Sequence, residues 1–585
     1  WHAIDSDLVD HPSNIRHTPL GSKTSPLALA GRMEHIAAVY QRIPSGRLVI
    51  LGRGGAGKAV LAARLARDLL ATRSPGDRVP VIVSLASWHP ATPLRDWLAT
   101  QLVRDYPALA ARAGGPSLAA ALLAADRILP ILDGFDEINT GLHEPSLRHL
   151  NTATSMPLVL TSRPEQYTVA VRHVDVLSHA AGIELDDLTP ADLATYLPRT
   201  TGRTTQDSDT GIWQPVLERL RHHPQDPAAS MAAQVLATPL MVFLARTIYS
   251  DAPGHNPEDL LDHTRFPTPA SLKEHLLAAY IPAVYLHTSP TGRSWNPDRS
   301  RRWLSHLAIH LNRHHTCDLA WWQLRNAVPA VIRTILVGLV VGLPVALAFG
   351  LAIGPEIGLA EGLIVGLGVG LLVGSDRTGP PPTRTHLQMR GGWRSVLIPV
   401  AVGLALGLGV GLMDRLAVGL AVGRAAWLTV GLAFGLAFAL AFGFKAPVNM
   451  AAASCATQTL TSDRTDTLRR IVIVGFVVGI VIGAPAGTGG GLNIGLAFGL
   501  AAGLAFGFDG AWGQWLVLVR FWMPLTNRLP WRTGAFITDA YRRGVLRQAG
   551  AVYQFRHASL QNHLAEEAAD PTGRWVRCQQ CDSGR

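Results

Sequence analysis

Residues 47–61 read RLVILGRGGAGKAVL: an apolar run, a glycine-rich turn and a run with apolar residues at helical spacing. This pattern predicts a strand, a loop and a helix in succession. The turn matches GxxxxGK, in which backbone N–H groups surround a phosphate chain at the start of a helix. The stretch therefore predicts a nucleotide-binding loop, whose lysine reaches the β- and γ-phosphates. Its candidate binding residues are Gly52, Gly54, Gly55, Gly57 and Lys58.

Ala59 stands where this loop normally has Ser or Thr, whose hydroxyl is a ligand of Mg²⁺. The alanine side chain has no oxygen to offer a metal. We therefore expect phosphate binding to survive this departure better than Mg²⁺-dependent hydrolysis.

A second motif is residues 128–138, ILPILDGFDEI, in which an apolar strand ends in carboxylates. Open α/β sheets bind their ligands at the carboxyl ends of the strands. We expect Asp133 to hold Mg²⁺ through water, and Asp136 or Glu137 to polarise the attacking water.

A third apolar strand, residues 157–161, is followed by Arg163. Its guanidinium is always charged and binds phosphate as a fork, so Arg163 is our candidate for sensing the γ-phosphate. The β-branched run at 79–85 predicts one more buried parallel strand. The order of elements predicts an α/β domain built on a parallel sheet.

Composition divides the 585-residue chain, because residues 331–508 are mostly Gly, Ala, Leu, Val and Phe with few charges. Such a region is typical of a bilayer-spanning protein. The net charge of +10 fits loops on the cytoplasmic side of a membrane better than a nucleic-acid partner, which we do not expect. The four cysteines predict no disulfide framework, and we interpret CQQC at 578–581 as part of a tail rather than as a zinc site.

The apolar region predicts about six crossings in three hairpins, joined by longer basic loops. Because arginine-rich loops face the cytoplasm, we expect a multi-pass protein of the cell (inner or plasma) membrane with both terminal parts cytoplasmic. Glycines at every fourth position favour a tight helix bundle or an oligomer over a pore. Charges near the predicted span ends, Glu361, Asp414, Arg415 and Arg424, fit snorkelling side chains. The expected spans are 335–353, 357–374, 396–413, 416–444, 471–485 and 492–508.

These motifs together resemble the NACHT family of STAND NTPases, of a bacterial, actinobacterial-like type with a multi-span membrane region. The residues that match are GRGGAGKA at 52–59, LDGFDE at 132–137 and LTSRP at 160–164, with weaker matches at 183–197, 236–245 and 553–567. The resemblance implies ATP or ADP with Mg²⁺ as cofactors, Pro239 against the adenine and His557 on the β-phosphate. It also implies self-oligomerisation and a role in signalling or defence.

The expected organisation begins with a linker at 1–28 and the P-loop NTPase domain at 29–180. Helical and first winged-helix-like parts follow at 181–330, and the transmembrane region occupies 331–510. Residues 511–567 would return to the cytoplasm and complete the winged-helix-like domain, and 568–585 would form a tail.

Three functions remain open at this point. The first is a membrane-anchored nucleotide-binding switch whose trigger is unknown. The second is an ATP-driven membrane transporter, although the chain has no LSGGQ-like signature and its predicted spans lack polar residues that could face a substrate. The third is a degenerate NTPase that acts as a membrane scaffold, for which Ala59 is the main support.

Overall fold

The computed structural model falls into two units, Trp1–Cys317 with Arg543–Val545 and Phe555–Arg585, and Asp318–Arg542 with Leu546–Gln554. The predicted spans 396–413 and 416–444, and Cys455, Cys578 and Cys581, lie outside the described residues. The structure describes residues 1–4, 6–16, 27–111, 115–138, 140–200, 211–251, 255–286, 294–314, 316–352, 354–376, 383–385, 445–447, 456–483, 487–508, 510–549 and 552–569.

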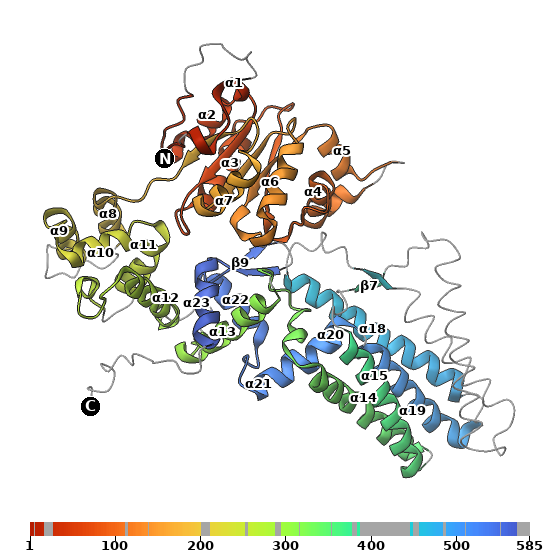
Figure 1. Ribbon diagram of the computed structural model, residues 1–585. Coiled ribbons are helices and arrows are strands. Elements are labelled where there is room, and N and C mark those ends of the chain that lie inside the picture. The colour runs from red at the N-terminus through yellow and green to blue at the C-terminus, as the bar shows by residue number, and fades with distance from the viewer. Residues whose placement is uncertain are drawn as a thin grey trace, which may run out of the picture. The chain divides into compact units, whose positions relative to one another are not determined.

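The first unit contains a six-stranded sheet in the order β1-β6-β2-β5-β4-β3 (Figure 1). The pairs β6–β2, β2–β5, β5–β4 and β4–β3 are parallel, which confirms the α/β prediction, whereas β1 joins the edge antiparallel and makes the sheet mixed. The strands are β1 (His2–Ala3), β2 (Arg47–Leu51), β3 (Val79–Ser84), β4 (Ile128–Asp133), β5 (Leu158–Ser162) and β6 (Ala181–Glu184).

Side chains of β2 alternate between two cores, because successive residues of a strand point to opposite faces. Leu48 and Ile50 pack with residues of α2 and α3, and Val49 and Leu51 pack on the other face with residues of α4, α5, α6 and α7. Burial on both faces explains why the strand is continuously apolar rather than alternating. These helices are α2 (Ile36–Gln41), α3 (Lys58–Ala71), α4 (Leu94–Asp105), α5 (Leu118–Ala124), α6 (His143–Thr152) and α7 (Pro164–Val174).

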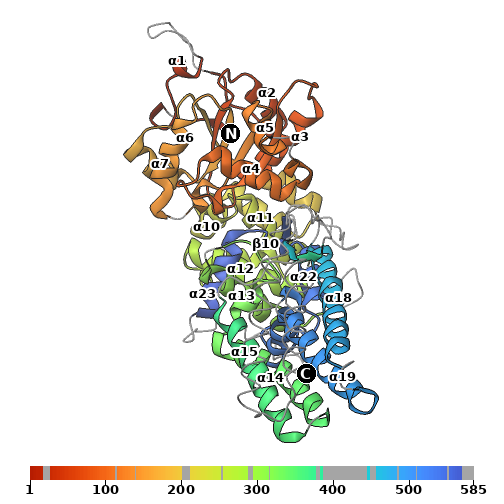
Figure 2. The same ribbon diagram turned by 90° about the vertical axis from the view of Figure 1, so that its right-hand side faces the viewer.

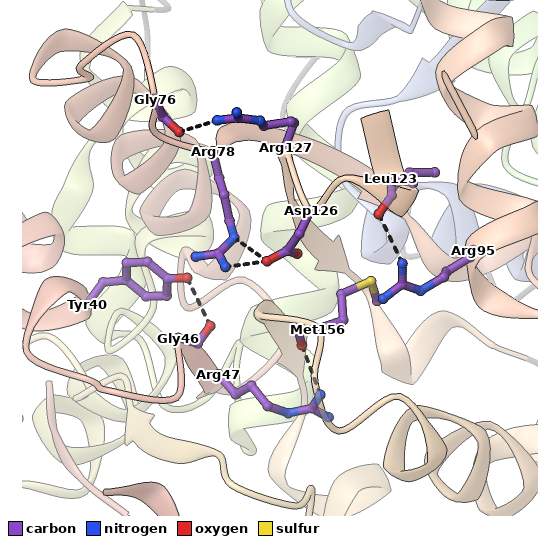
Figure 3. Close-up of polar contacts among 10 residues, drawn as sticks. All are labelled: Tyr40, Gly46, Arg47, Gly76, Arg78, Arg95, Leu123, Asp126, Arg127 and Met156. Carbon is purple, nitrogen blue, oxygen red and sulfur yellow. Dashed lines mark hydrogen bonds and ion pairs between the residues drawn. The ribbon is translucent and has the colours of Figure 1, made fainter. Parts of the chain in front are cut away.

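Arg47 anchors the amino-terminal end of β2 from inside the protein (Figure 3). Its guanidinium donates to the carbonyls of Leu150, Ala153 and Met156 at 3.1, 2.6 and 3.0 Å, just where α6 ends. Burial lowers the pKa of Arg47 to about 10. The side chain therefore satisfies carbonyls at the end of a helix that would otherwise be buried without donors.

The first residues pack on this domain, whereas we expected a linker at 1–28. β1 extends the sheet, Ile15 is buried in the core of α2 and α3, and Asp10 accepts a hydrogen bond from the backbone N–H of His179 at 2.6 Å. A two-residue strand carries too little periodicity to be found from sequence, and its pairing partner lies about 180 residues away.

The rest of the first unit is helical, and a late segment of the chain completes it. Arg301 of α13 pairs with Glu567 of α23, with Nε 3.2 Å from Oε2, and Gln561 donates to Asn312 at 2.7 Å. Its helices are α8 (Pro190–Tyr196), α9 (Gln214–His222), α10 (Pro227–Val235), α11 (Pro239–Arg246), α12 (Pro269–Leu286), α13 (Pro297–Arg313) and α23 (Ala558–Ala569).

The second unit is built on two helical hairpins (Figure 1 and Figure 2). Glycines bring the helices of each hairpin into backbone contact: a Cβ added at Gly338 would lie 2.9 Å from the carbonyl oxygen of Gly366, and one at Gly475 2.9 Å from that of Gly499. The expected close approach of the helices is thus present in both pairs. They are α14 (Ala330–Ala352) with α15 (Pro355–Ser375), and α18 (Ala456–Gly483) with α19 (Gly487–Phe508).

Shorter elements complete this unit. β7 pairs antiparallel with β8, and β9 pairs with β10. Their bounds, with those of the helical segments before them, are α20 (Ala511–Gln514), η13 (Trp515–Trp522), α21 (Met523–Leu525), α22 (Thr533–Arg542), β7 (Thr383–Thr385), β8 (Lys445–Pro447), β9 (Leu546–Ala549) and β10 (Val552–Phe555).

The expectation of about six membrane crossings is not supported. Among the described residues, two helices are long and apolar enough to cross a bilayer, Ala330–Leu351 and Gly358–Ser375. A third would require counting the pair Pro227–Val235 and Pro239–Asp251 as one span, although the pair is bent by 105° at its break. The first half of α18 carries Asp463, Asp466 and Arg469, and the apolar part of α19 is the short stretch Gly491–Ala505. The prediction counted each apolar run as a separate span, whereas such a run can be part of a longer helix that also has polar residues.

Candidate functional site

The turn between β2 and α3 has the geometry that a phosphate-binding loop requires. β2 is buried throughout, and α3 begins at Lys58, which confirms the predicted order of strand, loop and helix. Gly55 has φ = 84° and Gly57 has φ = 99°. Both values lie in the left-handed region, which glycine adopts without a steric cost, so the backbone turns tightly enough to present N–H groups at the start of α3.

Lys58 lies within this turn and is surrounded by charged groups. Its Nζ donates to the carbonyls of Gly52 at 2.7 Å and Arg53 at 3.3 Å. Burial lowers the pKa of Lys58, and the charges of Asp136, Arg163, Asp133 and Glu137 act on it as well. The residues that the sequence assigned to one site are thus brought together around the lysine.

Asp133 ends β4 and is held by a side chain of the neighbouring strand β5. The Thr161 hydroxyl donates to Asp133 Oδ1 at 2.6 Å and accepts from the backbone N–H of Gly134 at 2.9 Å. Sequence reasoning missed Thr161 as a positioning residue. The available signal was a threonine directly after the apolar residues LVL of this strand.

Arg163 and Asp136 form an ion pair at the carboxyl ends of β5 and β4. Arg163 Nε lies 2.8 Å from Asp136 Oδ2, and the carboxylate is 7% exposed. The guanidinium carbon also lies 3.5 Å from the place where a Cβ of Gly54 would stand, so Arg163 lies against the phosphate loop. Glu137 is exposed. Asp136, one of the two candidate bases, is thus held by the arginine in an ion pair.

The arrangement fits a phosphate chain better than it fits a fully ligated Mg²⁺. Backbone N–H groups at the start of α3 and the Lys58 ammonium are suited to phosphate oxygens. Ala59, the second residue of α3, offers no side-chain oxygen. Among the described residues, no group of three or more His, Cys, Asp or Glu side chains could hold a metal ion by itself. A metal here would depend on Asp133, water and the phosphates themselves.

The helical part of the first unit reaches the phosphate loop through the beginning of α11. The backbone N–H of Leu240 donates to the Gly55 carbonyl at 3.2 Å, and a Cβ at Gly55 would lie only 2.7 Å from the Leu240 Cβ. Pro239 Cγ lies 3.9 Å from the Cβ position of Gly57. Pro239, predicted from the resemblance to contact the adenine, thus lies against the phosphate loop.

His557, the residue just before α23, lies against a later part of α11. Its ring centroid is 6.2 Å from that of Phe243, which is one helical turn beyond Pro239, and the Arg556 guanidinium lies 5.8 Å from the Phe243 ring centroid. Phe243 also packs on Tyr280 of α12, at 5.9 Å between ring centroids. The structure therefore brings His557 to α11, and its role at the β-phosphate stays a prediction.

The comparison with protein families agrees with this geometry. Residues 47–203 match the family model of the NACHT domain, a stretch that begins at β2 and contains Lys58, Asp133, Asp136 and Arg163. This match supports a NACHT-type P-loop NTPase domain in this part of the chain. Among curated proteins, no significant match was found.

Proposed function

We propose that this protein is a membrane-anchored, NACHT-type switch that binds ATP or ADP and acts in signalling, with weak or absent hydrolysis. One observation carries the proposal: a phosphate-loop lysine, two carboxylates and an arginine from three parallel strands converge at one edge of the sheet. The helix that follows from the next part of the chain contacts the same loop. The phosphate loop would thus bind the nucleotide and also contact α11 through its own backbone.

The ion pair between Arg163 and Asp136 gives the switch a means of sensing the γ-phosphate. A γ-phosphate beside Arg163 would compete with the Asp136 carboxylate for the guanidinium, because both are anionic acceptors of its fork of donors. ATP and ADP would then favour different arrangements of these side chains. A ligand shifts an equilibrium only by its difference in affinity for the two states, and this exchange supplies such a difference.

The contact between Leu240 and Gly55 would pass this difference to α11. Because the Leu240 N–H is bonded to the loop carbonyl, a change in loop conformation alters the position of the helix start. Phe243 on the same helix touches Tyr280, Arg556 and His557. The path from the phosphates to the winged-helix-like part therefore consists of direct contacts within one unit.

Ala59 limits the chemistry that we propose. When Mg²⁺ is bound, it neutralises the phosphates and aids hydrolysis. Without a hydroxyl at position 59 the metal has one protein ligand fewer, so we expect nucleotide exchange rather than turnover to set the state of the switch.

The membrane part of the proposal rests on α14 and α15, which are long and apolar enough to span a bilayer. It also rests on chain topology, because α23 follows the hairpins in sequence and yet packs on α13, which precedes them. Both flanking parts would then lie in the cytoplasm, with the hairpins inserted into a split winged-helix-like domain. Self-oligomerisation and a role in defence follow from the family resemblance alone.

Calorimetric titration of the full-length protein in detergent with ATP and ADP tests the proposal. Lys58→Ala should abolish binding because it removes the charged donor, whereas Lys273→Ala, on the exposed side of α12, should leave the affinity unchanged. Ala59→Thr should restore Mg²⁺-dependent turnover. If the wild type binds neither nucleotide, the protein is a scaffold built on a degenerate NTPase, and the proposal is wrong.

A further inference from the structure

The second unit exposes a cluster of aromatic, aliphatic and cationic side chains just after the last hairpin. Phe521, Leu525 and Trp531 are 54%, 63% and 53% exposed, and the Phe521 and Trp531 rings meet edge to face at 6.1 Å between centroids. Three arginines accompany them. The Phe521 surface, as we call it, consists of Arg520, Phe521, Leu525, Arg528, Trp531 and Arg532.

The charge of this segment is entirely positive. Residues 510–538 contain three arginines and no Asp or Glu. Within the part of the chain that the structure describes, none of these three guanidiniums is in an ion pair. Large exposed apolar side chains that lie together mark a binding surface. The positive charge of the arginines favours a negatively charged partner.

Contacts within the unit place the helical segment α20–η13–α21 at the end of the apolar helices (Figure 1). Asp463, in the polar half of α18, accepts from the backbone N–H of Trp512 at 2.8 Å. Buried Arg325 donates to the side chain of Gln514, and it lies 3.1 Å from the carboxylate of Asp376, the residue after α15. The segment therefore lies at the level where α14 begins and α15 ends.

The same segment has a buried and an exposed face. Trp515, Leu518, Val519 and Met523 are buried, and η13 packs against α14. The opposite face carries Phe521 and Leu525. One apolar face of the segment thus packs inside the unit, and a second apolar face stays exposed.

We propose that the Phe521 surface lies in the headgroup layer of the membrane and binds anionic phospholipid. Aromatic rings gather at the boundary between water and hydrocarbon, and guanidiniums bind phosphate as a fork. The segment that carries this surface packs against α14, so a bilayer around α14 and α15 accounts for the surface better than a separate protein partner does. This inference rests on the proposal that α14 and α15 cross a bilayer.

Photo-crosslinking of the full-length protein in lipid nanodiscs tests it. The photoreactive amino acid p-benzoylphenylalanine replaces Leu525, or Leu347 in the last third of α14, which has nearly the same exposure of 65%. A third variant carries it at Tyr106, 52% exposed on the NTPase domain. We expect lipid adducts at 525 and 347 but none at 106. The adducts at 525 should be more abundant in discs with phosphatidylglycerol than in pure phosphatidylcholine.

Removal of charge provides the second arm. Arg528→Gln should lower the yield of phosphatidylglycerol adducts at 525 about fivefold, which corresponds to one cation near an anionic surface, and leave the yield at 347 unchanged. Arg172→Gln, on the exposed side of α7, is the matched control.

The outcomes separate the two proposals. Adducts at 347 without adducts at 525 would overturn this inference and leave the membrane anchor standing. Absence of lipid adducts at both positions would overturn the anchor itself. Adducts at 525 to a second copy of the chain, or to another segment of it, would identify a protein contact in place of lipid. Equal yields in the two lipids would refute the preference for anionic headgroups.

Discussion

Backbone elements pack closely in both the NTPase sheet and the glycine hairpins, but different side chains make this possible in the two regions. At the sheet, buried polar side chains such as Arg47 and Thr161 satisfy specific atoms of neighbouring strands and helices. In the hairpins, side chains are removed, so that one helix backbone rests on another. Packing at the sheet depends on a few residues with specific hydrogen-bonding groups, whereas packing in the hairpins depends on glycines at the positions where the two helices meet. Mutations should therefore act on the two regions through different mechanisms.

The largest effect is expected from Arg47→Ala, which removes buried hydrogen bonds of the NTPase domain. It leaves three carbonyl acceptors at the end of α6 without their donor and creates a cavity. We expect a loss of roughly 3–5 kcal/mol of stability. Thermal unfolding of the purified protein measures it, with Arg127→Ala, an exposed arginine that donates to the Gly76 carbonyl, as the control. Equal midpoints for the two variants would contradict our account of Arg47.

Gly342→Leu tests whether the close contact between α14 and α15 depends on glycine. A Cβ at Gly342 would lie 2.5 Å from the Gly362 carbonyl oxygen, so α14 and α15 must separate, at a cost of about 1–3 kcal/mol. Gly368→Leu lies on the same hairpin, and its Cβ meets no atom within 4 Å. The first variant should lower the unfolding midpoint in detergent and the second should not. Equal destabilisation by both would show that the backbone contact at Gly342 does not decide the packing of this hairpin.

Acid should weaken the helical part of the first unit more than the sheet. Burial lowers the pKa of His310 on α13 to about 4, helped by the charges of His314, His306 and Arg313. The unfolded chain binds a proton at this histidine near pH 6.5, whereas the folded chain stays neutral until about pH 4. Stability is therefore complete above pH 6.5 and falls as the pH drops toward 4.

Between pH 7 and pH 5 this amounts to about 1–2 kcal/mol for His310. Thermal melts across this range measure the slope, and His310→Leu should flatten it. His275, whose pKa is also lowered to about 4 by burial, would contribute a further part. An unchanged slope in His310→Leu would mean that other groups control the acid response.

The smallest effect concerns nucleotide discrimination. Arg163→Ala removes the guanidinium that pairs with Asp136, and we expect about a tenfold loss of ATP affinity with little change for ADP. Arg172→Ala, exposed on α7, controls for loss of a positive charge on the helix that follows Arg163. Equal losses for ATP and ADP would show that Arg163 does not sense the γ-phosphate. Titration calorimetry distinguishes these results.

Much of the site was predictable because its parts are local. The loop from Gly52 to Lys58 and the acidic turn after β4 are written in contiguous residues, where period and turn chemistry act over a few positions. The edge of the sheet at which they meet also follows, since parallel strands end on the same side. Thr161 and the pairing of Arg163 with Asp136 did not follow, because each depends on which strands become neighbours.

Local pattern alone was thus sufficient for the strand, loop and helix around Lys58, the position of Asp133 at the end of β4 and the apolar character of the hairpins. Packing between distant segments assigned the rest: β1 at the sheet edge, Leu240 on the phosphate loop, His557 beside Phe243 and the polar first half of α18. The physical reason is that backbone periodicity is set by neighbours in the chain. Contacts between residues tens to hundreds of positions apart exist only once burial has brought their elements together.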